Sequence, residues 1–294
     1  MLFQSSRNWV HDFFRRRGWL IGLRPQRRRM TAACAPVAAA SELLEQRVLL
    51  STITVTTLAD TLMAGASHGV TLRDAIYAAN NDVKVDGSVA GQSGVTNVIV
   101  FAAGLNGTIS MALGEFAISS SVNIQGNGVG STIIDARHNS RIFDIAGTDG
   151  DVMLAGMTLE NGTTTGQGFS GSGGAVYFAS TGTLTLTNSA LSNNTTGGDY
   201  ADGGAVFSIG TVTVTNSTVS GNSVSGFAAR GAGVDGWTGP VVILNSTISG
   251  NTDYGPHGDG GGIYSLQGAV TVTNSTLSGN AATVITGTAT GSTR

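Results

Sequence analysis

The most regular feature of the chain is an alternation of apolar and polar residues in short stretches. In the segments 183–187, 211–215 and 270–273, Leu or Val alternates with Thr at every second position. A period of two is typical of β-strands, in which successive side chains point to opposite faces. The sequence therefore predicts many short strands, each with one apolar and one polar face.

These strands recur at a fixed interval. Glycine-rich segments begin at Gly173, Gly203, Gly231 and Gly260, with spacings of 30, 28 and 29 residues. Asparagine keeps nearly the same interval in two series: Asn188, Asn216, Asn245 and Asn274, and Asn194, Asn222, Asn251 and Asn280. Self-similarity at a fixed period indicates a stacked repeat architecture.

Each unit of about 29 residues offers three inward-facing strand stretches, which is one turn of a three-sided coil. One unit cannot bury its apolar face alone, whereas units stacked about 4.8 Å apart bury a continuous aliphatic column. We therefore expect an all-β fold, a right-handed single-stranded parallel β-helix. The asparagines should stack at its corners, where their side chains bond the backbone and tolerate left-handed conformations. A leucine-rich repeat is disfavoured because the units lack its Leu-x-x-Leu-x-Leu run and any helix.

One helix is expected before the coil, over the segment TLRDAIYAANN. Its apolar residues share one helical face, and Thr71 with Asp74 matches a capping box. A helix here would cover the open end of the coil, where unpaired strand edges aggregate unless they are protected. The predicted organisation is a basic export-signal-like tail over 1–51, an N-terminal strand and capping helix over 52–94, and the β-helix over 95–294.

Charge divides the chain in the same place. Residues 1–50 hold nine Arg against three acids, whereas residues 51–294 hold six basic and fifteen acidic groups. Nucleic-acid binding needs clustered cations, so an acidic body argues against a nucleic-acid partner. Cys34 is the single cysteine, which excludes an intrachain disulfide. No run of 18 apolar residues occurs, so no transmembrane segment is expected.

The end of the tail carries a motif. The segment LEQRVLLS at 44–51 resembles the LEPRxLLS element of planctomycete extracellular proteins, with Gln46 in place of the proline. The resemblance implies export to the cell surface, the outer membrane or the medium. It agrees with the positively charged region followed by small residues, an order that is typical of export signals. A disordered basic tail is the alternative.

Two further resemblances concern the body of the chain. Thr56–Asp60 and Thr71–Ile76 resemble the CSLREA-type N-terminal region of bacterial β-helix surface proteins, without its cysteine. The recurring Gly-Gly-Ala-Val and Leu/Val/Ile-Ser-x-Asn signals over 173–282 are similar to the repeats of polymorphic outer-membrane proteins. These resemblances imply a surface-exposed, adhesin-like protein.

Candidate catalytic residues are few. Asp135, Arg137, His138 and Asp144 form, with Arg141, the densest charged cluster. Glycoside hydrolysis needs carboxylates that converge on one face, and this cluster is the place to look for them. Solvated turn residues are the simpler interpretation.

Calcium is the one cofactor with any support, and we otherwise expect none. Asp199, Asp202 and Asp259, with Asp253, precede successive glycine pairs, and clustered oxygens suit calcium. The spacing of calcium-binding β-rolls is absent, and His257 has no second histidine nearby to indicate zinc.

Two functions stay open. The first is a secreted or cell-surface scaffold or adhesin that contacts an extracellular polysaccharide or another surface component, without catalysis. The second is a polysaccharide lyase or glycoside hydrolase that uses acidic residues on an outer face. The sequence after Asn280 has no recognisable cap, which is typical of a piece of a larger protein or of a coil that self-associates end to end.

Overall fold

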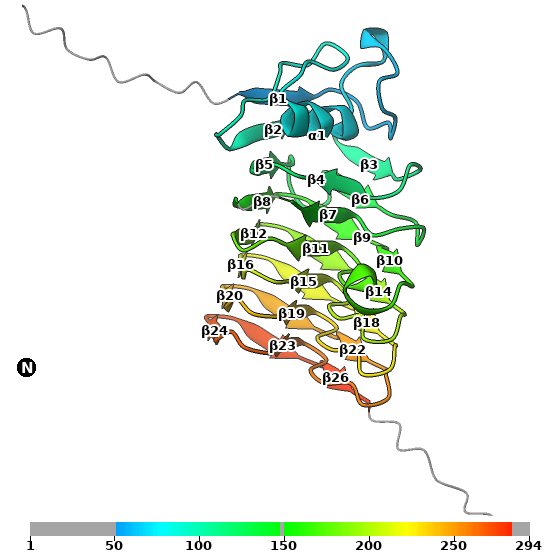
Figure 1. The fold of residues 1–294 in the computed structure, drawn as a ribbon, viewed down its shortest axis with the longest axis vertical. Coiled ribbons are helices and arrows are strands. Elements are labelled where there is room, and N and C mark those ends of the chain that lie inside the picture. The colour runs from blue at the N-terminus through cyan, green and yellow to red at the C-terminus, as the bar shows by residue number, and fades with distance from the viewer. Residues whose placement is uncertain (1–50, 148–149, 284–294) are drawn as a thin grey trace, which may run out of the picture. The chain divides into compact units, whose positions relative to one another are not determined.

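The computed structural model describes residues 51–147 and 150–283, in which the chain winds as a coil of parallel strands of about six turns (Figure 1). Strands of the same type in successive turns pair in register, as Leu184 pairs with Val212 and Val212 with Val241. The predicted fold class, a parallel β-helix with very little helix, is confirmed.

Sheet A is the longest ladder. Its strands, in order along the axis, are β1 (Thr52–Val55), β2 (Asn97–Phe101), β5 (Val122–Gln125), β8 (Val152–Ala155), β12 (Thr183–Thr187), β16 (Thr211–Thr215), β20 (Val241–Leu244) and β24 (Val270–Thr273). The strand expected ahead of the coil, β1, pairs with β2 and so begins this sheet.

Two further sheets complete the main sides. Sheet B contains β3 (Gly107–Ser110), β6 (Thr132–Asp135), β9 (Thr158–Glu160), β13 (Ala190–Ser192), β17 (Thr218–Ser220), β21 (Thr247–Ser249) and β25 (Thr276–Ser278). Sheet C contains β4 (Phe116–Ile118), β7 (Phe143–Ala146), β11 (Val176–Ala179), β15 (Val206–Ser208), β19 (Val234–Gly236) and β23 (Ile263–Ser265).

A fourth, narrow ladder was not anticipated from the sequence. Sheet D consists of two-residue strands between sheets B and C in the later turns: β10 (Thr163–Thr164), β14 (Thr195–Thr196), β18 (Ser223–Val224), β22 (Thr252–Asp253) and β26 (Ala281–Ala282). The chain leaves each of the first four by a loop that returns to sheet C. One such loop contains a short 3₁₀ helix, η2 (Gly168–Gly171).

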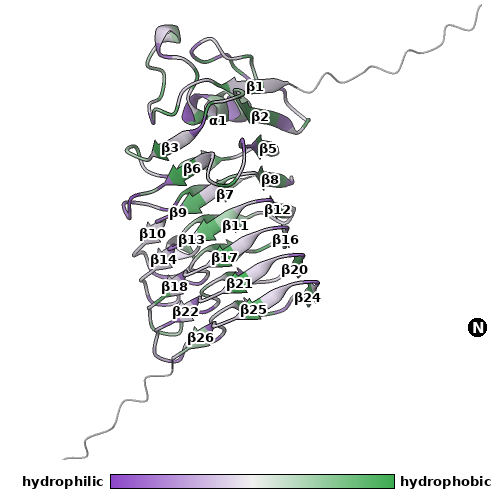
Figure 2. Ribbon diagram, turned by 180° about the vertical axis from the view of Figure 1, so that it is seen from behind, coloured by the Kyte–Doolittle hydropathy of each residue, from purple (hydrophilic) through white to green (hydrophobic). Residues whose placement is uncertain are grey.

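The interior is the expected aliphatic column. Leu186 of β12 pairs with Val214 of β16, and neither side chain is exposed to solvent. The alternate residues of the same strands are Thr, which lie half-buried on the outside. Hydrophobic segments recur in the strands of the stacked turns (Figure 2). The column is continuous, because residues from β1 to β21 belong to one buried cluster.

The two asparagine series do different things. In the series Asn194, Asn222, Asn251 and Asn280, the side-chain nitrogens of the first three donate to the side-chain oxygen one turn further on, at 2.9, 2.8 and 2.9 Å. The first three of these residues are buried. The other series is exposed and has φ angles of 48 to 50°, left-handed values that asparagine tolerates. One series therefore bonds successive turns together, and the other makes the corner.

The N-terminal end of the coil is covered by α1 (Leu72–Asn81), which packs against β1, β2 and β4 (Figure 1). The expected capping box is present: the Thr71 hydroxyl accepts from the Asp74 N–H at 3.0 Å, and Asp74 Oδ2 accepts from the Thr71 N–H at 3.0 Å. Leu72, Ala75 and Ile76 are buried on the face turned to the coil. A second short 3₁₀ helix, η1 (Ala66–His68), precedes α1.

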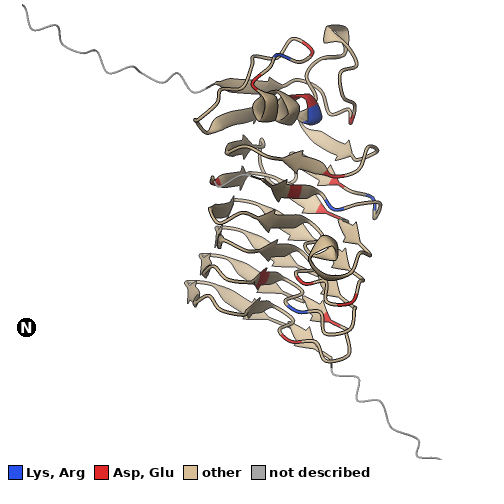
Figure 3. Ribbon diagram, viewed as in Figure 1, with Lys and Arg blue, Asp and Glu red and all other residues tan. Residues whose placement is uncertain are grey.

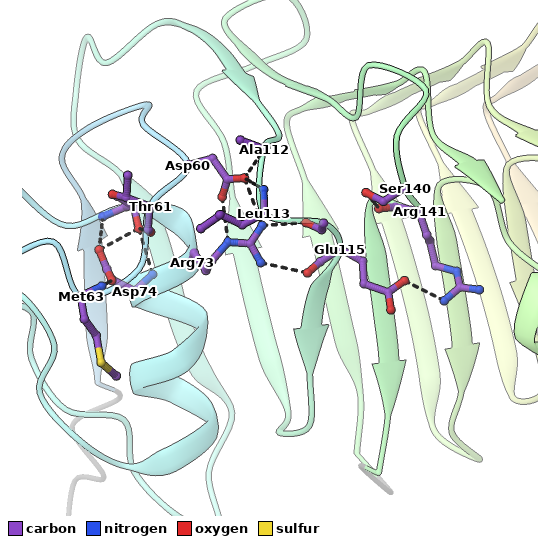
Figure 4. Close-up of polar contacts among 12 residues, drawn as sticks. Asp60, Thr61, Met63, Arg73, Asp74, Ala112, Leu113, Glu115, Ser140 and Arg141 are labelled. Carbon is purple, nitrogen blue, oxygen red and sulfur yellow. Dashed lines mark hydrogen bonds and ion pairs between the residues drawn. The ribbon is translucent and has the colours of Figure 1, made fainter.

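An arginine ties this cap to the first turn. Arg73 Nε donates to Asp60 Oδ1 at 2.7 Å, and the other guanidinium nitrogens donate to the carbonyls of Glu115 and Gly114 (Figure 4). Burial alone would raise the pKa of Asp60, but bonds from Arg73 and from the Ala112 and Leu113 N–H groups outweigh it and lower that pKa. Asp60 and Arg73 therefore act as an ion pair between the cap and the coil.

Candidate functional site: a cavity over sheet C

The outer face of sheet C differs from the threonine-rich outer faces of its neighbours. Its strands present one outward column of paired residues, which runs Ala117, Asp144, Tyr177, Phe207, Asp235 and Tyr264. These residues alternate with buried Phe143, Val176, Val206 and Val234, so they lie on the opposite face of each strand. An outward face this aromatic is covered from water in most proteins.

The loops from sheet D form that cover. Phe207 is outward-facing but has no exposed surface, because Phe169 of η2 lies 5.5 Å from it and Tyr177 stacks on it at 5.5 Å, centroid to centroid. Trp237, directly after β19, meets Phe169 edge to face at 4.9 Å and 89°. The aromatic side chains thus build a second small packing layer outside the coil.

A cavity of about 250 Å³ opens in this layer. The loops 165–172, 197–202 and 225–230 belong to consecutive turns and stack above one another beside the cavity. The residues that line it are Gly168, Phe169, Tyr200, Asp202, Ala228, Arg230 and Trp237. Three aromatic rings, one acid and one arginine therefore face a single small space.

Buried carboxyl groups gather beside this cavity. Asp202 on the wall is 3% exposed, and Asp235 in β19 is fully buried. Asp202 Oδ1, both carboxyl oxygens of Asp235 and Arg230 Nε are buried without a hydrogen-bond partner. The Arg230 guanidinium lies 5.2 Å over the Tyr264 ring. Buried polar atoms without partners are costly, and their concentration here marks the place where the fold departs from its regular pattern.

The surroundings raise the pKa of three of these acids. Burial raises the pKa of Asp202 to about 6, although the charge and backbone N–H of Arg230 oppose it. Burial and the charge of Asp202 raise the pKa of Asp235 well above its usual value. Burial, opposed by the Gly255 N–H, raises the pKa of Asp253 in β22 to about 6. Asp202, with its raised pKa on the wall of a cavity, is the kind of acid that is typical of functional sites.

The charged cluster expected from sequence is divided between two sheets. Asp135 ends β6 of sheet B, where its Oδ1 accepts from the Arg137 N–H and from Asn161 Nδ2. His138 lies beside Thr163, with Nδ1 at 3.2 Å from the hydroxyl. Asp135 pairs across turns with Glu160, whose pKa rises through burial and then through the Asp135 charge.

Its other two members lie over sheet C. Arg141 donates to Glu115 Oε2 at 2.9 Å (Figure 4). It also donates to the backbone carbonyl of Ser170 and stacks on Tyr177 at 4.9 Å. Asp144 belongs to the outward column of the same sheet, next to Tyr177. Asp135 and Asp144 therefore do not converge, because strands β6 and β7 belong to different sides of the coil.

The calcium candidates make different contacts, although the charge of Asp253 acts on Asp202 and the charge of Asp259 acts on Asp253. Asp199 Oδ1 accepts from the Phe227 N–H at 2.9 Å, which ties one loop to the next. Asp202 lines the cavity, and Asp259 is exposed and pairs with Arg230 through its backbone, in an isolated parallel β-bridge. Over residues 51–147 and 150–283, no group of three or more His, Cys, Asp or Glu side chains is placed to hold a metal ion.

Sequence reasoning singled out Asp202 for calcium and missed Asp235, Arg230 and the aromatic walls. A signal was available. Tyr177, Phe207, Asp235 and Tyr264 follow the glycine pairs at spacings of 30, 28 and 29, and an acid in a column of aromatics breaks the repeat. Figure 3 shows the consequence, since charge concentrates near the cap and on the loops beside sheets C and D, while the strands of sheet A carry none.

The class of protein follows from these observations: a right-handed parallel β-helix with a loop-covered cavity on one side. The family model described as right-handed beta helix region matches residues 119–293, and the chain belongs to this family. The fold is found in adhesins and also in pectate lyase-like enzymes. In the comparisons with curated proteins and with solved structures, nothing matches.

Two sequence-based expectations fall at or beyond the described residues. The export-type motif at 44–51 lies outside them except for Ser51, as does the C-terminal segment 284–294. Among the helices of the described part, none has the length and apolar character needed to cross a bilayer.

Proposed function

We propose that this protein is an extracellular or cell-surface β-helix that binds carbohydrate in the cavity over sheet C. The observation that carries the proposal is the joint presence of Phe169, Tyr200 and Trp237 with Asp202 and Arg230 around one space of about 250 Å³. Ligand pockets combine apolar and aromatic walls with a few polar groups that fix orientation. A sugar ring has one apolar face for stacking and hydroxyl groups for the polar residues.

The size of the cavity supports a short ligand segment. Pockets for drug-sized molecules measure roughly 300–1,000 Å³, so this cavity suits about one sugar ring. A polysaccharide would then insert one residue or its end, while the exposed Tyr200 and Phe169 extend the contact. The coil acts as the rigid scaffold that holds the three loops in place.

The location is supported by the tail. The segment LEQRVLLS at 44–51 resembles the LEPRxLLS element of planctomycete extracellular proteins, and Arg-rich segments precede it. An epitope-tagged chain produced in a planctomycete host should be accessible to protease on intact cells or recovered from the medium. Deletion of residues 44–51 should retain it inside, and an unchanged distribution would contradict the assigned address.

Binding can be measured by the fluorescence of Trp237. The sequence has three tryptophans, and the other two are Trp9 and Trp19, so a W9F/W19F variant reports on the cavity alone. Neutral, acidic and basic oligosaccharides of two to six residues should be titrated. We expect a saturable change with at least one class. Absence of any change, together with absence of binding heat, would contradict the proposal.

Matched aromatic variants test the position of the site. Trp237→Ala, followed by titration calorimetry, should weaken binding at least tenfold, because central aromatic residues dominate interfaces. Tyr254→Ala removes an exposed ring that does not line the cavity and should leave binding unchanged. Equal losses in both variants would contradict the assignment to this cavity.

A second candidate function is hydrolysis or elimination of a polysaccharide. One observation favours it: two coupled acids with raised pKa values, Asp202 and Asp235, lie beside Arg230. A protonated carboxylic acid near neutral pH is the group that protonates a leaving oxygen in glycoside cleavage.

Product release decides between binding and cleavage. Reducing ends and unsaturated products should be measured after incubation with a panel of acidic and neutral polysaccharides, with and without calcium. Turnover that disappears in Asp202→Asn and persists in Asp135→Asn would establish an enzyme of this cavity. Binding without turnover would establish the binding function alone.

A further inference from the structure

The aromatic walls of the cavity can attract a positively charged group, which a neutral ligand does not provide. Phe169 and Trp237 stand perpendicular to each other, 89° apart with centroids at 4.9 Å, and Tyr200 closes the same space. The faces of aromatic rings carry negative potential and attract cations, most strongly in the case of Trp. The aromatic walls of the cavity, rather than the contact between Phe169 and Trp237 itself, suit a compact organic cation.

The carboxyl groups add to this potential. Asp202 Oδ1 belongs to a side chain on the cavity wall that is 3% exposed, and this oxygen has no hydrogen-bond partner. Asp235 lies behind it with both oxygens unpartnered. Ionised carboxylate oxygens accept hydrogen bonds and donate none. Asp202 Oδ1 therefore suits a hydrogen-bond donor.

One positive group also lines the space and has to be weighed. Arg230 is half-buried, and its guanidinium stacks over Tyr264 at 5.2 Å. Against this single cation stand Asp202 on the wall, which ionises near pH 6, and Asp253, whose charge acts on it. Arg230 lowers the pKa of Asp202 and Asp235 without cancelling the effect of burial, so these acids are only partly compensated. An anionic ligand would meet this excess of acid, whereas a cation would relieve it.

We propose that the cavity recognises an organic ammonium group, carried by an unacetylated amino sugar at the end or within a glycan. The ammonium donates to Asp202 Oδ1 and lies against the rings of Phe169, Tyr200 and Trp237. This inference rests on the proposed carbohydrate binding and specifies its ligand class. An N-acetylated sugar has no charge at this position, so it loses the attraction to the ring faces and keeps only a weaker, neutral N–H donor.

The titration of Asp202 gives the proposal a characteristic pH dependence. The groups that face it are Arg230 from the following loop, Asp235 from β19 and Asp253 from β22. Its pKa is about 6 in the free protein, and a bound cation favours the ionised form. Binding therefore releases a proton near pH 6, and affinity rises as pH increases from 5 to 7. An anionic ligand would show the opposite dependence.

The test uses the full-length W9F/W19F protein with glucosamine, N-acetylglucosamine and glucose, as monomers and as tetramers, in calorimetry and Trp237 fluorescence. At pH 7 we expect the glucosamine tetramer to bind at least tenfold more tightly than the N-acetylated and glucose tetramers. The preference should fall at pH 5. Choline is the second arm: if it competes with the glucosamine tetramer, the ammonium alone is sufficient, and if it does not, the sugar ring is required.

Matched acid variants complete the test. Asp202→Asn should reduce the preference for glucosamine to less than threefold, whereas Asp259→Asn, which removes an exposed acid outside the cavity, should keep it. Thermal unfolding checks that both variants fold; the pH dependence of the unmutated cavity gives an independent answer if the first does not. Equal binding of the three tetramers would overturn the ammonium inference and leave carbohydrate binding intact. Absence of binding by every oligosaccharide would overturn both.

Discussion

Sheets A and C belong to the same coil, yet their outer faces follow different rules. On the outside of sheet A, β12 and β16 present threonines, and none of its strands carries a charged residue. On the outside of sheet C, aromatic side chains and Asp235 lie under loops, and several polar atoms are buried without partners. The repeat builds both sides, so the difference supports the proposal that sheet C carries a binding site on a coil that sheet A helps to stabilise.

The largest expected effect is a loss of stability in a variant of sheet A. Leu186→Ala removes a fully buried side chain from β12 and should lower the free energy of unfolding by about 2–5 kcal/mol, through lost burial and the cavity left behind. Thr185→Ala, one position away on the outer face, should change it by less than about 0.5 kcal/mol. Urea unfolding measures both; similar effects would contradict the assigned inner and outer faces.

The second-largest loss of stability is expected in the hydrogen-bonded ladder of Asn194, Asn222, Asn251 and Asn280. Asn222 donates to Leu191 O at 3.1 Å and to Asn251 Oδ1 at 2.8 Å, and it accepts from Asn194. Asn222→Ala leaves several buried groups unpaired, so we expect a loss of about 2–4 kcal/mol in urea unfolding. Asn216→Ala, at an exposed corner with φ of 50°, should cost about 1–2 kcal/mol. A smaller loss at Asn222 than at Asn216 would show that the ladder contributes little.

A substitution beside the cavity should raise the free energy of unfolding instead of lowering it. Asp235→Leu replaces a buried acid without partners by an apolar residue between Phe207 and Tyr264. We expect thermal unfolding to report a gain of about 1–2 kcal/mol, as is common when strained functional positions are replaced. The same variant should lose affinity for the glucosamine tetramer. Destabilisation by more than about 1 kcal/mol would indicate that this acid supports the fold.

The smallest expected effect is the pH dependence of stability. Asp202 and Asp253 have pKa values of about 6 in the folded protein, above the ordinary 3.8. The folded state therefore holds protons that the unfolded chain has released, so the free energy of unfolding falls as pH rises from about 4 to 6. A rise of about two in pKa corresponds to about 3 kcal/mol at most. Because relaxation and water access around the carboxyl groups reduce it, each group should contribute on the order of 1 kcal/mol, or about 2–4 °C in melting temperature.

Paired substitutions identify the source of that slope. Thermal unfolding of the Asp202→Asn and Asp253→Asn double variant should reduce the dependence between pH 4 and 6, and Asp235, whose pKa is also raised, should account for the slope that remains. Asp60, with its lowered pKa, acts in the opposite direction at lower pH and lies outside this window. An unchanged slope in the double variant would assign the dependence to other groups.

The sequence predicts the two sides unequally, for a physical reason. The positions of Leu186 and Val214 follow from a period of two within a period of about 29, and the capping box of Thr71 and Asp74 follows from local residue order. The cavity depends on how loops of successive turns stack, and no local rule places Phe169 against Trp237 across three turns. Asp135 and Asp144 were grouped because they are close in sequence, whereas strands on different sides of the coil hold them apart.

Sheet D was missed for a related reason. Its strands have only two residues each, too few to show an alternating pattern. They define where the cavity loops begin, so the shape of the site depends on an element that the sequence hardly marks.

Hydrogen exchange with and without the glucosamine tetramer at pH 7 tests most directly whether the loop-covered side of the coil is the binding side. Slower exchange is expected in the segments 165–172, 197–205 and 225–239, which surround the cavity, with no change along β12, β16 and β20 of sheet A. Slower exchange along the threonine-rich face of sheet A, with the cavity segments unchanged, would contradict the account.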